Sequence, residues 1–244
     1  MTPDISVIRY TLTDSTNARA KEYIINGEEP LPALFIADAQ SAGRGRMGRS
    51  FYSPSGTGLY ATLLFKAPLL EDKLLSITAL AAVAATEAIN ELFGIKVGIK
   101  WVNDLYKDGR KVAGILAESF ERLSERYIAL GIGINLFTSE FPDELEHKAG
   151  SLLSAPVDKE KVDALALLFS ERLLSLLDSD DVSSAINLYR ERSCVLGRRI
   201  SFLRGEREIF ATAKEITDSG ALTVSLDDGG EMTLSTGEIS IFLQ

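Results

Sequence analysis

Cysteine and histidine are scarce in this sequence: Cys194 and His147 are the only residues of each kind among 244. A single cysteine excludes an internal disulfide and is typical of the reducing cytoplasm, where we expect this protein to reside. The chain also offers no set of ligands for zinc, no Ser-His-Asp triad and no Cys-His pair. Catalysis would therefore rest on positioning and electrostatics, and any metal would be a hard cation such as Mg²⁺.

Long apolar runs are also missing. No uncharged apolar segment of about 18 residues is present, so neither a membrane-spanning helix nor a membrane partner is predicted. The first four residues begin no basic stretch with an apolar core behind it, which argues against a secretion signal. Hydrophobic residues make up 45% and charged residues 25%, values that exclude a disordered or fibrous chain. The length fits one large domain or two modest ones.

Positive charge is in deficit, with 26 Lys and Arg against 35 Asp and Glu and a net charge of −9. A protein that binds DNA over its whole surface would normally be basic, so we expect no DNA partner. Arg44, Arg46 and Arg49 nevertheless stand close together with no acidic residue among them. Such local basic charge favours a small anionic ligand. A solvated basic loop explains these arginines equally well.

Periodicity predicts an α+β main domain, in which strands of antiparallel type are combined with segregated helices. Asp14 to Asn17 offer N-cap residues for the first helix, and Gly94 closes the longest one. Asp108-Gly109 predicts a hairpin turn. Strands are expected over residues 6–12, 34–39, 59–65, 97–101, 112–118 and 127–134, and helices over 18–25, 74–93, 162–177 and 183–192.

The pattern changes after Cys194. Short strand-like runs, separated by Gly- and Asp-rich turns, predict a small SH3-like β-barrel. We therefore expect two domains, a catalytic domain over residues 1–190 and a barrel domain over residues 191–244. The expected strands of the barrel cover residues 199–203, 208–216, 222–226, 231–234 and 239–242.

The run Gly43-Arg44-Gly45-Arg46-Met47-Gly48 matches G-x-G-x-x-G. The dinucleotide-binding form of this motif needs a helix directly after the glycines, whereas turn residues and Pro54 follow here. A Walker A loop is excluded because no Gly-Lys-Ser/Thr ends the motif. What remains is a glycine loop that carries arginines, which suits phosphates or a carboxylate that is being activated.

Three further segments have both a functional and an ordinary interpretation. Residues 100–104, Lys-Trp-Val-Asn-Asp, stand where a strand enters a turn, and a plain polar turn is the simpler explanation. Lys111 opens an apolar strand that contains Gly114, a pattern of close ligand approach or of a bulge. Gly131 and Gly133 alternate along another strand, so one face lacks side chains. That face is either a slot for a flat apolar group or a surface packed against a helix.

Taken together, these segments resemble the biotin–protein ligases, also called biotin–[acetyl-CoA-carboxylase] ligases. Their order and spacing agree with the family over residues 14–135, and the C-terminal barrel also fits. The resemblance implies a mixed sheet with helices, as in the class II aminoacyl-tRNA synthetase/biotin ligase catalytic fold. The matching segments are Asp14-Ser15-Thr16-Asn17, residues 40–46, Ser53-Pro54 with Gly58-Leu59-Tyr60, and residues 100–104, 111–116 and 131–135.

The resemblance implies a reaction in two steps. Biotin and ATP give biotinyl-5′-AMP and pyrophosphate with the help of Mg²⁺, and a lysine of a biotin carboxyl carrier domain of a carboxylase then accepts the biotin. Since 13 residues precede Asp14, we expect the short form without the N-terminal DNA-binding domain of some members. A homodimer is compatible with the family. The alternatives are a lipoate-type protein ligase and a non-catalytic adenylate-binding regulator.

The family also implies roles for individual residues. Arg46 and Lys111 would be catalytic, and Asp104 would hold Mg²⁺ or orient an arginine. The residues implied for biotin are Ser15, Thr16, Asn17, Gln40, Gly43, Arg44, Gly45, Arg46, Lys111, Gly114, Leu116, Gly131 and Gly133. The residues implied for ATP and the adenylate are Arg44, Arg46, Arg49, Phe51, Asn103, Lys111 and Asn135, with Phe51 as a stacking surface for adenine.

Overall fold

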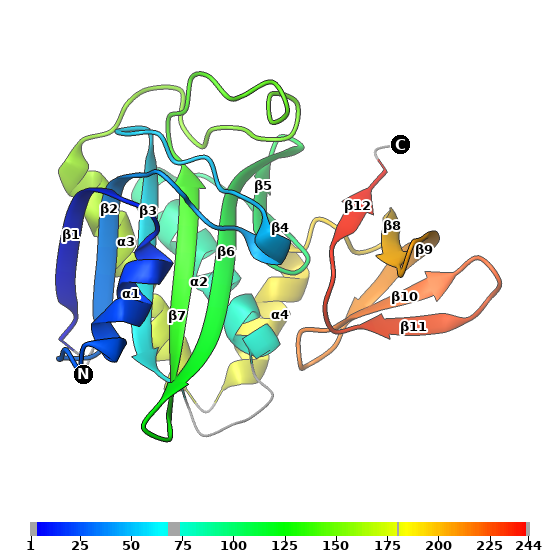
Figure 1. Ribbon diagram of the computed structural model, residues 1–244. Coiled ribbons are helices and arrows are strands. Elements are labelled where there is room, and N and C mark those ends of the chain that lie inside the picture. The colour runs from blue at the N-terminus through cyan, green and yellow to red at the C-terminus, as the bar shows by residue number, and fades with distance from the viewer. Residues whose placement is uncertain (1–3, 68–73, 180, 243–244) are drawn as a thin grey trace.

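The computed structural model describes residues 4–67, 74–179 and 181–242. Its larger sheet has seven strands in the order β1-β2-β3-β7-β6-β5-β4 (Figure 1). β1 pairs with β2 in parallel, and the other neighbouring strands of this sheet are antiparallel. The strands are β1 (Ser6–Thr13), β2 (Ala33–Gln40), β3 (Gly58–Lys66), β4 (Gly98–Lys100), β5 (Asp104–Lys107), β6 (Arg110–Arg122) and β7 (Glu125–Asn135).

The helices divide between the two faces of this sheet. Strand residues alternate between faces, so Phe35 of β2 packs with α1 while Leu34 and Ile36 belong to the core beneath α2 and α3. Because α1 covers only part of its face, the rest is left open for a site. The helices are α1 (Thr16–Ile25) on one face and α2 (Leu74–Phe93), α3 (Lys159–Leu177) and α4 (Val182–Arg192) on the other (Figure 1).

Helix α2 is the most apolar element of the core. Its alanines allow close packing against α3, and Gly94, with a φ of 67°, ends it as predicted. Among the described helices, α2 alone is long and apolar enough to span a membrane, with a mean hydropathy of 1.3 over its best window. However, 72% of that window is buried inside the protein. The helix therefore has the surroundings of a core helix.

A second, antiparallel sheet follows α4 and has five strands in the order β11-β10-β9-β8-β12. Its inner face joins the same hydrophobic core as the larger sheet. The indole Nε1 of Trp101 donates to the carbonyl of Gly220 over 2.9 Å, which ties the two sheets together. The strands are β8 (Arg199–Arg204), β9 (Arg207–Ile216), β10 (Leu222–Leu226), β11 (Glu231–Leu234) and β12 (Ile239–Ile241).

The α+β class and the predicted helices and strands are confirmed. The turn at Asp108 and Gly109 is also confirmed, since both residues have positive φ values of 52° and 75°. No strand was predicted at β5, whose four residues include only two apolar ones. The division near residue 190 stays a prediction, although α4 ends at Arg192 and β8 begins at Arg199.

Candidate active site

A cavity of about 970 Å³ opens on the face of the sheet that α1 leaves uncovered. Its walls come from the start of α1, the loop between β2 and β3, the strands β6 and β7, and the C-terminal sheet. Gly43 and Asn135, which were also predicted, are not among the residues that line it. The predicted site residues that line the cavity are Ser15, Thr16, Asn17, Gln40, Arg44, Gly45, Arg46, Arg49, Phe51, Asn103, Asp104, Lys111, Gly114, Leu116, Gly131 and Gly133.

Neutral polar side chains meet at one end of the cavity. Gln40 organises this end, because its Oε1 accepts from the backbone N–H of Thr16 over 2.8 Å. Its Nε2 donates to Ser53 Oγ over 3.0 Å, and Ser53 in turn donates to the carbonyl of Phe51. Ser15 is buried beside them at the start of α1. The arrangement suits a neutral ligand group with both hydrogen-bond donors and acceptors.

The bare face of β7 is filled by two side chains of the protein. A Cβ atom on Gly131 would stand 2.3 Å from Asn17 Oδ1, and one on Gly133 would stand 2.5 Å from Phe51 Cε1. The ring of Phe51 also approaches Gly114, at 3.5 Å from its Cβ position. Side chains of the protein thus lie close over these glycines, which still line the cavity, and their contact with a ligand stays a prediction. Asn17 and Phe51 form the cavity wall on which a ligand would rest.

The glycine loop between β2 and β3 is folded back on itself. Gly45 N–H donates to the carbonyl of Arg49 over 2.7 Å, and Phe51 N–H donates to the carbonyl of Gly43 over 2.8 Å. Gly43 cannot carry a side chain, since a Cβ there would stand 2.5 Å from the carbonyl oxygen of Phe51. Met47, at the tip, has a φ of 56° and is 76% exposed. This fold brings the arginines of the loop to the rim of the cavity.

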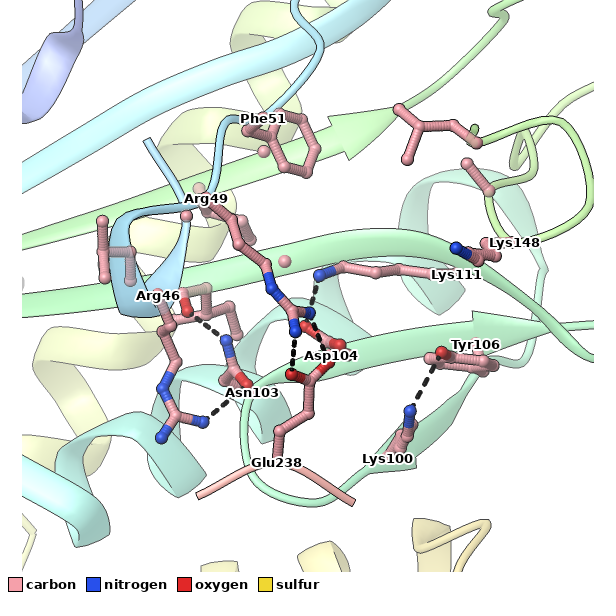
Figure 2. A pocket seen from close by; sticks show the side chains of 18 of the residues that line it. Arg46, Arg49, Phe51, Lys100, Asn103, Asp104, Tyr106, Lys111, Lys148 and Glu238 are labelled. Atoms are coloured by element: carbon pink, nitrogen blue, oxygen red, sulfur yellow. Dashed lines mark hydrogen bonds and ion pairs between the residues drawn. The ribbon is translucent and has the colours of Figure 1, made fainter. Parts of the chain in front are cut away.

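Cationic side chains gather at the other end of the cavity (Figure 2). Lys111 Nζ lies 2.6 Å from Asp104 Oδ1, and Arg46 Nη1 donates to Asn103 Oδ1 over 3.1 Å. Arg49, from the loop, forms an ion pair of 2.6 Å with Glu238, which belongs to the C-terminal sheet region. Two distant parts of the chain thus meet over one end of the cavity. An anionic ligand would find several cations there.

The asparagines predicted for the adenine side differ in their surroundings. Asn103 lines the cavity. Its Nδ2 donates a hydrogen bond to the carbonyl of Ile115 over 2.7 Å, and its Oδ1 accepts one from Arg46 Nη1. Asn135 is only 5% exposed, and its Nδ2 donates to the carbonyl of Gly150 over 3.2 Å. Asn135 therefore anchors the loop that contains Gly150 behind the cavity wall.

The donor set at Asp104 does not fit a resident magnesium ion. Its carboxylate already faces the ammonium of Lys111 at 2.6 Å, and its side chain is only 15% exposed. Across the ranges that the structure describes, no three His, Cys, Asp or Glu side chains gather as a metal site. Of the two roles predicted for Asp104, the geometry supports orientation of a cation, and that cation is Lys111 instead of an arginine.

Several lining residues were not predicted as site residues. Lys100 lies 3.3 Å from the hydroxyl of Tyr106, and burial lowers the pKa of this lysine. Lys148 approaches from the loop after β7, and Glu238 comes from the C-terminal sheet region (Figure 2). Lys100 stood inside a segment that the sequence did flag. Lys148 and Glu238 have no local sequence signal, because only the tertiary fold brings them here.

Comparison with known families gives two matches along the chain. The sequence profile of the biotin/lipoate A/B protein ligase family matches residues 10–135. The profile of the biotin protein ligase C-terminal domain matches residues 195–241. The first match contains nearly all of the residues that line the cavity from the larger sheet, and the second covers the smaller sheet.

Individual relatives agree with these families. A biotin–[acetyl-CoA-carboxylase] ligase from Paracoccus denitrificans is 33% identical over 222 residues, which cover 86% of this chain and 90% of that protein. The bifunctional ligase/repressor BirA of Bacillus subtilis is 38% identical over 156 residues. Those residues cover 63% of this chain and 48% of that protein, so the match spans about half of the relative's length.

A solved structure has the same fold over nearly the whole chain. It is the biotin protein ligase from Aquifex aeolicus in complex with biotin and ATP, with a TM-score of 0.81 and 27% sequence identity. The superposition covers 98% of this chain and 99% of that one. The catalytic fold and the C-terminal domain expected from the sequence are thereby confirmed together.

Proposed function

The chain belongs to the biotin/lipoate A/B protein ligase family, and from this premise we propose that it is an ATP-dependent biotin–protein ligase. It would join biotin to AMP and then pass the biotin to a lysine of a biotin carboxyl carrier domain of a carboxylase. One observation carries the proposal: a single cavity has a neutral polar end at Gln40 and a cationic end at Lys111. Biotin has matching ends, a ureido ring and a carboxylate.

In the first step, a carboxylate oxygen of biotin attacks the α-phosphorus of ATP and pyrophosphate leaves. Two anions must approach each other, so cations are needed to offset their repulsion. One opposite charge at 4 Å contributes about 4 kcal/mol at an effective dielectric constant of about 20. Lys111 and the arginines of the glycine loop line the cavity where this charge would gather. They act by fixed charge, which needs little reorganisation during the reaction.

Asp104 has a positioning role in this scheme. Its carboxylate holds Lys111 Nζ at 2.6 Å and so fixes the ammonium within the cavity. Asn103 holds Arg46 in the same way over 3.1 Å. Magnesium would enter as part of the MgATP substrate, because this ion keeps water ligands and binds mainly through substrate phosphates.

In the second step, the amine of the carrier lysine attacks the carbonyl carbon of the mixed anhydride. The new C–N bond forms, a proton leaves the amine, and AMP departs with the electrons of the broken C–O bond. Until that point the anhydride must be kept from water. Phe51 and the folded glycine loop cover one wall of the cavity and are placed to limit access of water there.

The test measures pyrophosphate release from MgATP with biotin, with lipoate, and with neither acid. Mass spectrometry then identifies the ligand that the protein retains. We expect release with biotin only and a bound biotinyl-AMP, followed by transfer to a recombinant biotin carboxyl carrier domain. Release with lipoate only would assign the chain to the lipoate-type branch. No release with either acid would exclude a ligase and leave an adenylate-binding regulator.

A further inference from the structure

The loop of residues 101–103 connects the residues that hold two cations of the cavity. β4 ends at Lys100 and β5 begins at Asp104, and these two residues are paired across the hairpin. Asn103 Oδ1 accepts a hydrogen bond from Arg46 Nη1 over 3.1 Å, and Asp104 Oδ1 lies 2.6 Å from Lys111 Nζ (Figure 2). The position of this loop therefore decides where the ends of both cationic side chains lie.

The larger sheet supports this loop from one side. β4 is the edge strand of the sheet and has three residues, so the hairpin gains little from its own pairing. On the side of β6, the N–H of Ile115 donates to the carbonyl of Asn103 over 2.9 Å. Asn103 Nδ2 donates back to the carbonyl of Ile115 over 2.7 Å. These two bonds fix the last residue of the loop, whereas Trp101 and Val102 take their support from other elements.

Trp101 and Val102 are bonded to elements outside the larger sheet. The indole Nε1 of Trp101 donates over 2.9 Å to the carbonyl of Gly220, which lies in the turn between β9 and β10. The carbonyl of Val102 accepts from the hydroxyl of Tyr189, in α4, over 3.1 Å. Trp101 and Val102 are each 3% exposed, and Tyr189 is completely buried. Because water cannot replace a lost partner at such depth, each bond constrains its part of the loop.

The turn that carries Gly220 is itself fixed to the helices. Gly220 has a φ of 84°, and a Cβ atom there would stand 3.5 Å from Leu75 Cγ, near the start of α2. Arg190 of α4 donates through Nε to the carbonyl of Ile216 over 2.7 Å and forms an ion pair of 2.6 Å with Asp218. The carbonyl of Gly220 thus has a defined position relative to α2 and α4, and it can serve the indole as a fixed acceptor.

We propose that Trp101 and Tyr189 are positioning residues for the formation of the adenylate. Their hydrogen bonds hold the loop in the position in which it supports both Lys111 and Arg46. The polar atom of each side chain is bonded to a carbonyl of the protein, so neither residue is catalytic. The inference rests on the proposed function, because it explains how the cations of the first step are held in place.

An ordinary packing role for the two side chains predicts a different result. If they only joined the two sheets, removal of the indole N–H or of the hydroxyl would lower the free energy of unfolding and leave kcat of the folded enzyme unchanged. The positioning role predicts a lower kcat with little change in the affinity for biotin. The polar end of the cavity at Gln40 is built by other segments of the chain, so it should not respond to the loop.

The primary test is Trp101→Phe, which removes the N–H and keeps an aromatic ring. Pyrophosphate release at saturating MgATP and biotin measures kcat, and calorimetry measures the affinity for biotin. We expect kcat to fall about ten-fold, because a small displacement of a positioned charge is costly to the rate. The affinity for biotin should stay within about three-fold of the wild type. Denaturant titration establishes that the variant is folded in the assay. A folded variant with the kcat of the wild type would overturn the proposal.

Tyr189→Phe tests the second bond and covers the case in which Trp101→Phe fails to fold. It removes one hydroxyl and retains Trp101, the only tryptophan of the chain, whose fluorescence then reports on the joint between the two sheets. We expect an unchanged emission maximum and a several-fold lower kcat. Tyr23→Phe is the matched control, since Tyr23 is 8% exposed and also directs its hydroxyl to a carbonyl, that of Pro30, but from α1. Equal effects of the two variants on kcat would refute the positioning role.

A double-variant cycle shows whether the effect on the rate passes through Lys111. Trp101→Phe is combined with Lys111→Ala, and the rate of adenylate formation is measured in single turnovers. Once Lys111 is removed, Trp101→Phe should lower this rate by less than about two-fold, because the two residues act on the same step as a unit. The same fall with and without Lys111 would show that Trp101 acts by another route. If the wild type itself released no pyrophosphate with biotin, the proposed function would fall, and this inference with it.

Discussion

The ring of Phe51 lies over the backbone of Gly133, so closely that a Cβ atom there would stand 2.5 Å from Phe51 Cε1. This contact joins the loop after β2 to the middle of β7. Tyr60 supports the ring from the neighbouring strand, with ring centroids 6.4 Å apart in an edge-to-face arrangement. The loop and the sheet therefore share one wall of the cavity.

Gly133→Ala should push Phe51 away from this wall. Because the interior has no spare room for a methyl group, we expect a loss of about 1–3 kcal/mol in the free energy of unfolding and weaker biotin binding. Denaturant titration and calorimetry measure the two effects. Adding Phe51→Leu to Gly133→Ala should recover most of the stability, since a smaller side chain leaves the space free. A double variant no more stable than Gly133→Ala would show that the two residues do not interact as described.

Lys111→Ala should slow the formation of the adenylate while biotin still binds. Removing one preorganised charge typically costs 10²–10³ in kcat, and we expect a fall of about that size in pyrophosphate release. The affinity for biotin should fall less than about ten-fold, because Gln40 and its neighbours remain. Lys66→Ala is the control, as Lys66 forms an exposed pair with Glu125 instead. Unchanged pyrophosphate release would remove Lys111 from the catalytic group.

Arg46→Ala should shorten the retention of biotinyl-AMP far more than it weakens free biotin. A hydrogen bond to a charged group is worth about 1.5–3 kcal/mol, which corresponds to a ten- to hundred-fold faster loss of the adenylate. Rapid gel filtration at intervals after adenylate formation follows the release. Arg126→Ala, which removes an exposed arginine paired with Glu121, serves as the control. Equal losses for biotin and the adenylate would make Arg46 a general binding residue.

The stability of the protein should depend on pH through Glu118. Hydrogen bonds hold its pKa below the usual value of 4.5 despite burial. An acid with a lowered pKa in the folded state stabilises the fold above the pKa of the unfolded chain, and this contribution disappears as the pH falls through the folded value. Glu118→Gln should therefore be less stable than the wild type at about pH 7, by about 1 kcal/mol or less, and closer to it at about pH 3.5. Denaturant titrations at both pH values test this. A constant difference would contradict it.

Much of the fold was predictable because alternation and helical periodicity are strong in this chain. Gly94 follows the last residue of α2, and Asp108 and Gly109 form the turn between β5 and β6. All three have the positive φ values that such helix ends and tight turns require. β5 was missed because Asp104 and Lys107 at its ends are charged, and four residues are too few for a periodic signal. Such a short strand is recognised only once β6 pairs with it.

The cavity was predictable in outline. The glycine loop at residues 43–48 and the glycines within the strands, at 114, 131 and 133, indicated where other groups approach the backbone closely. What fills the space above the glycines of β7 could not be predicted, because Asn17 and Phe51 reach it from distant segments. The residue roles, the domain boundary, the homodimer and the cytoplasmic location stay predictions.

The order of strands in the larger sheet sets when the cavity can exist during synthesis. β3 pairs with β7, with Gly58 opposite Asn135. The strands β1, β2 and β3 can therefore join the rest of the sheet only after β7, which is synthesised later. Helix α2 emerges in the interval, as apolar as a membrane span, before α3 and α4 are available to cover it. At this stage the nascent chain exposes the apolar surface of α2 and lacks the cavity. A ligand of the cavity can stabilise only the finished sheet, so it would rescue unstable variants after translation and not during it.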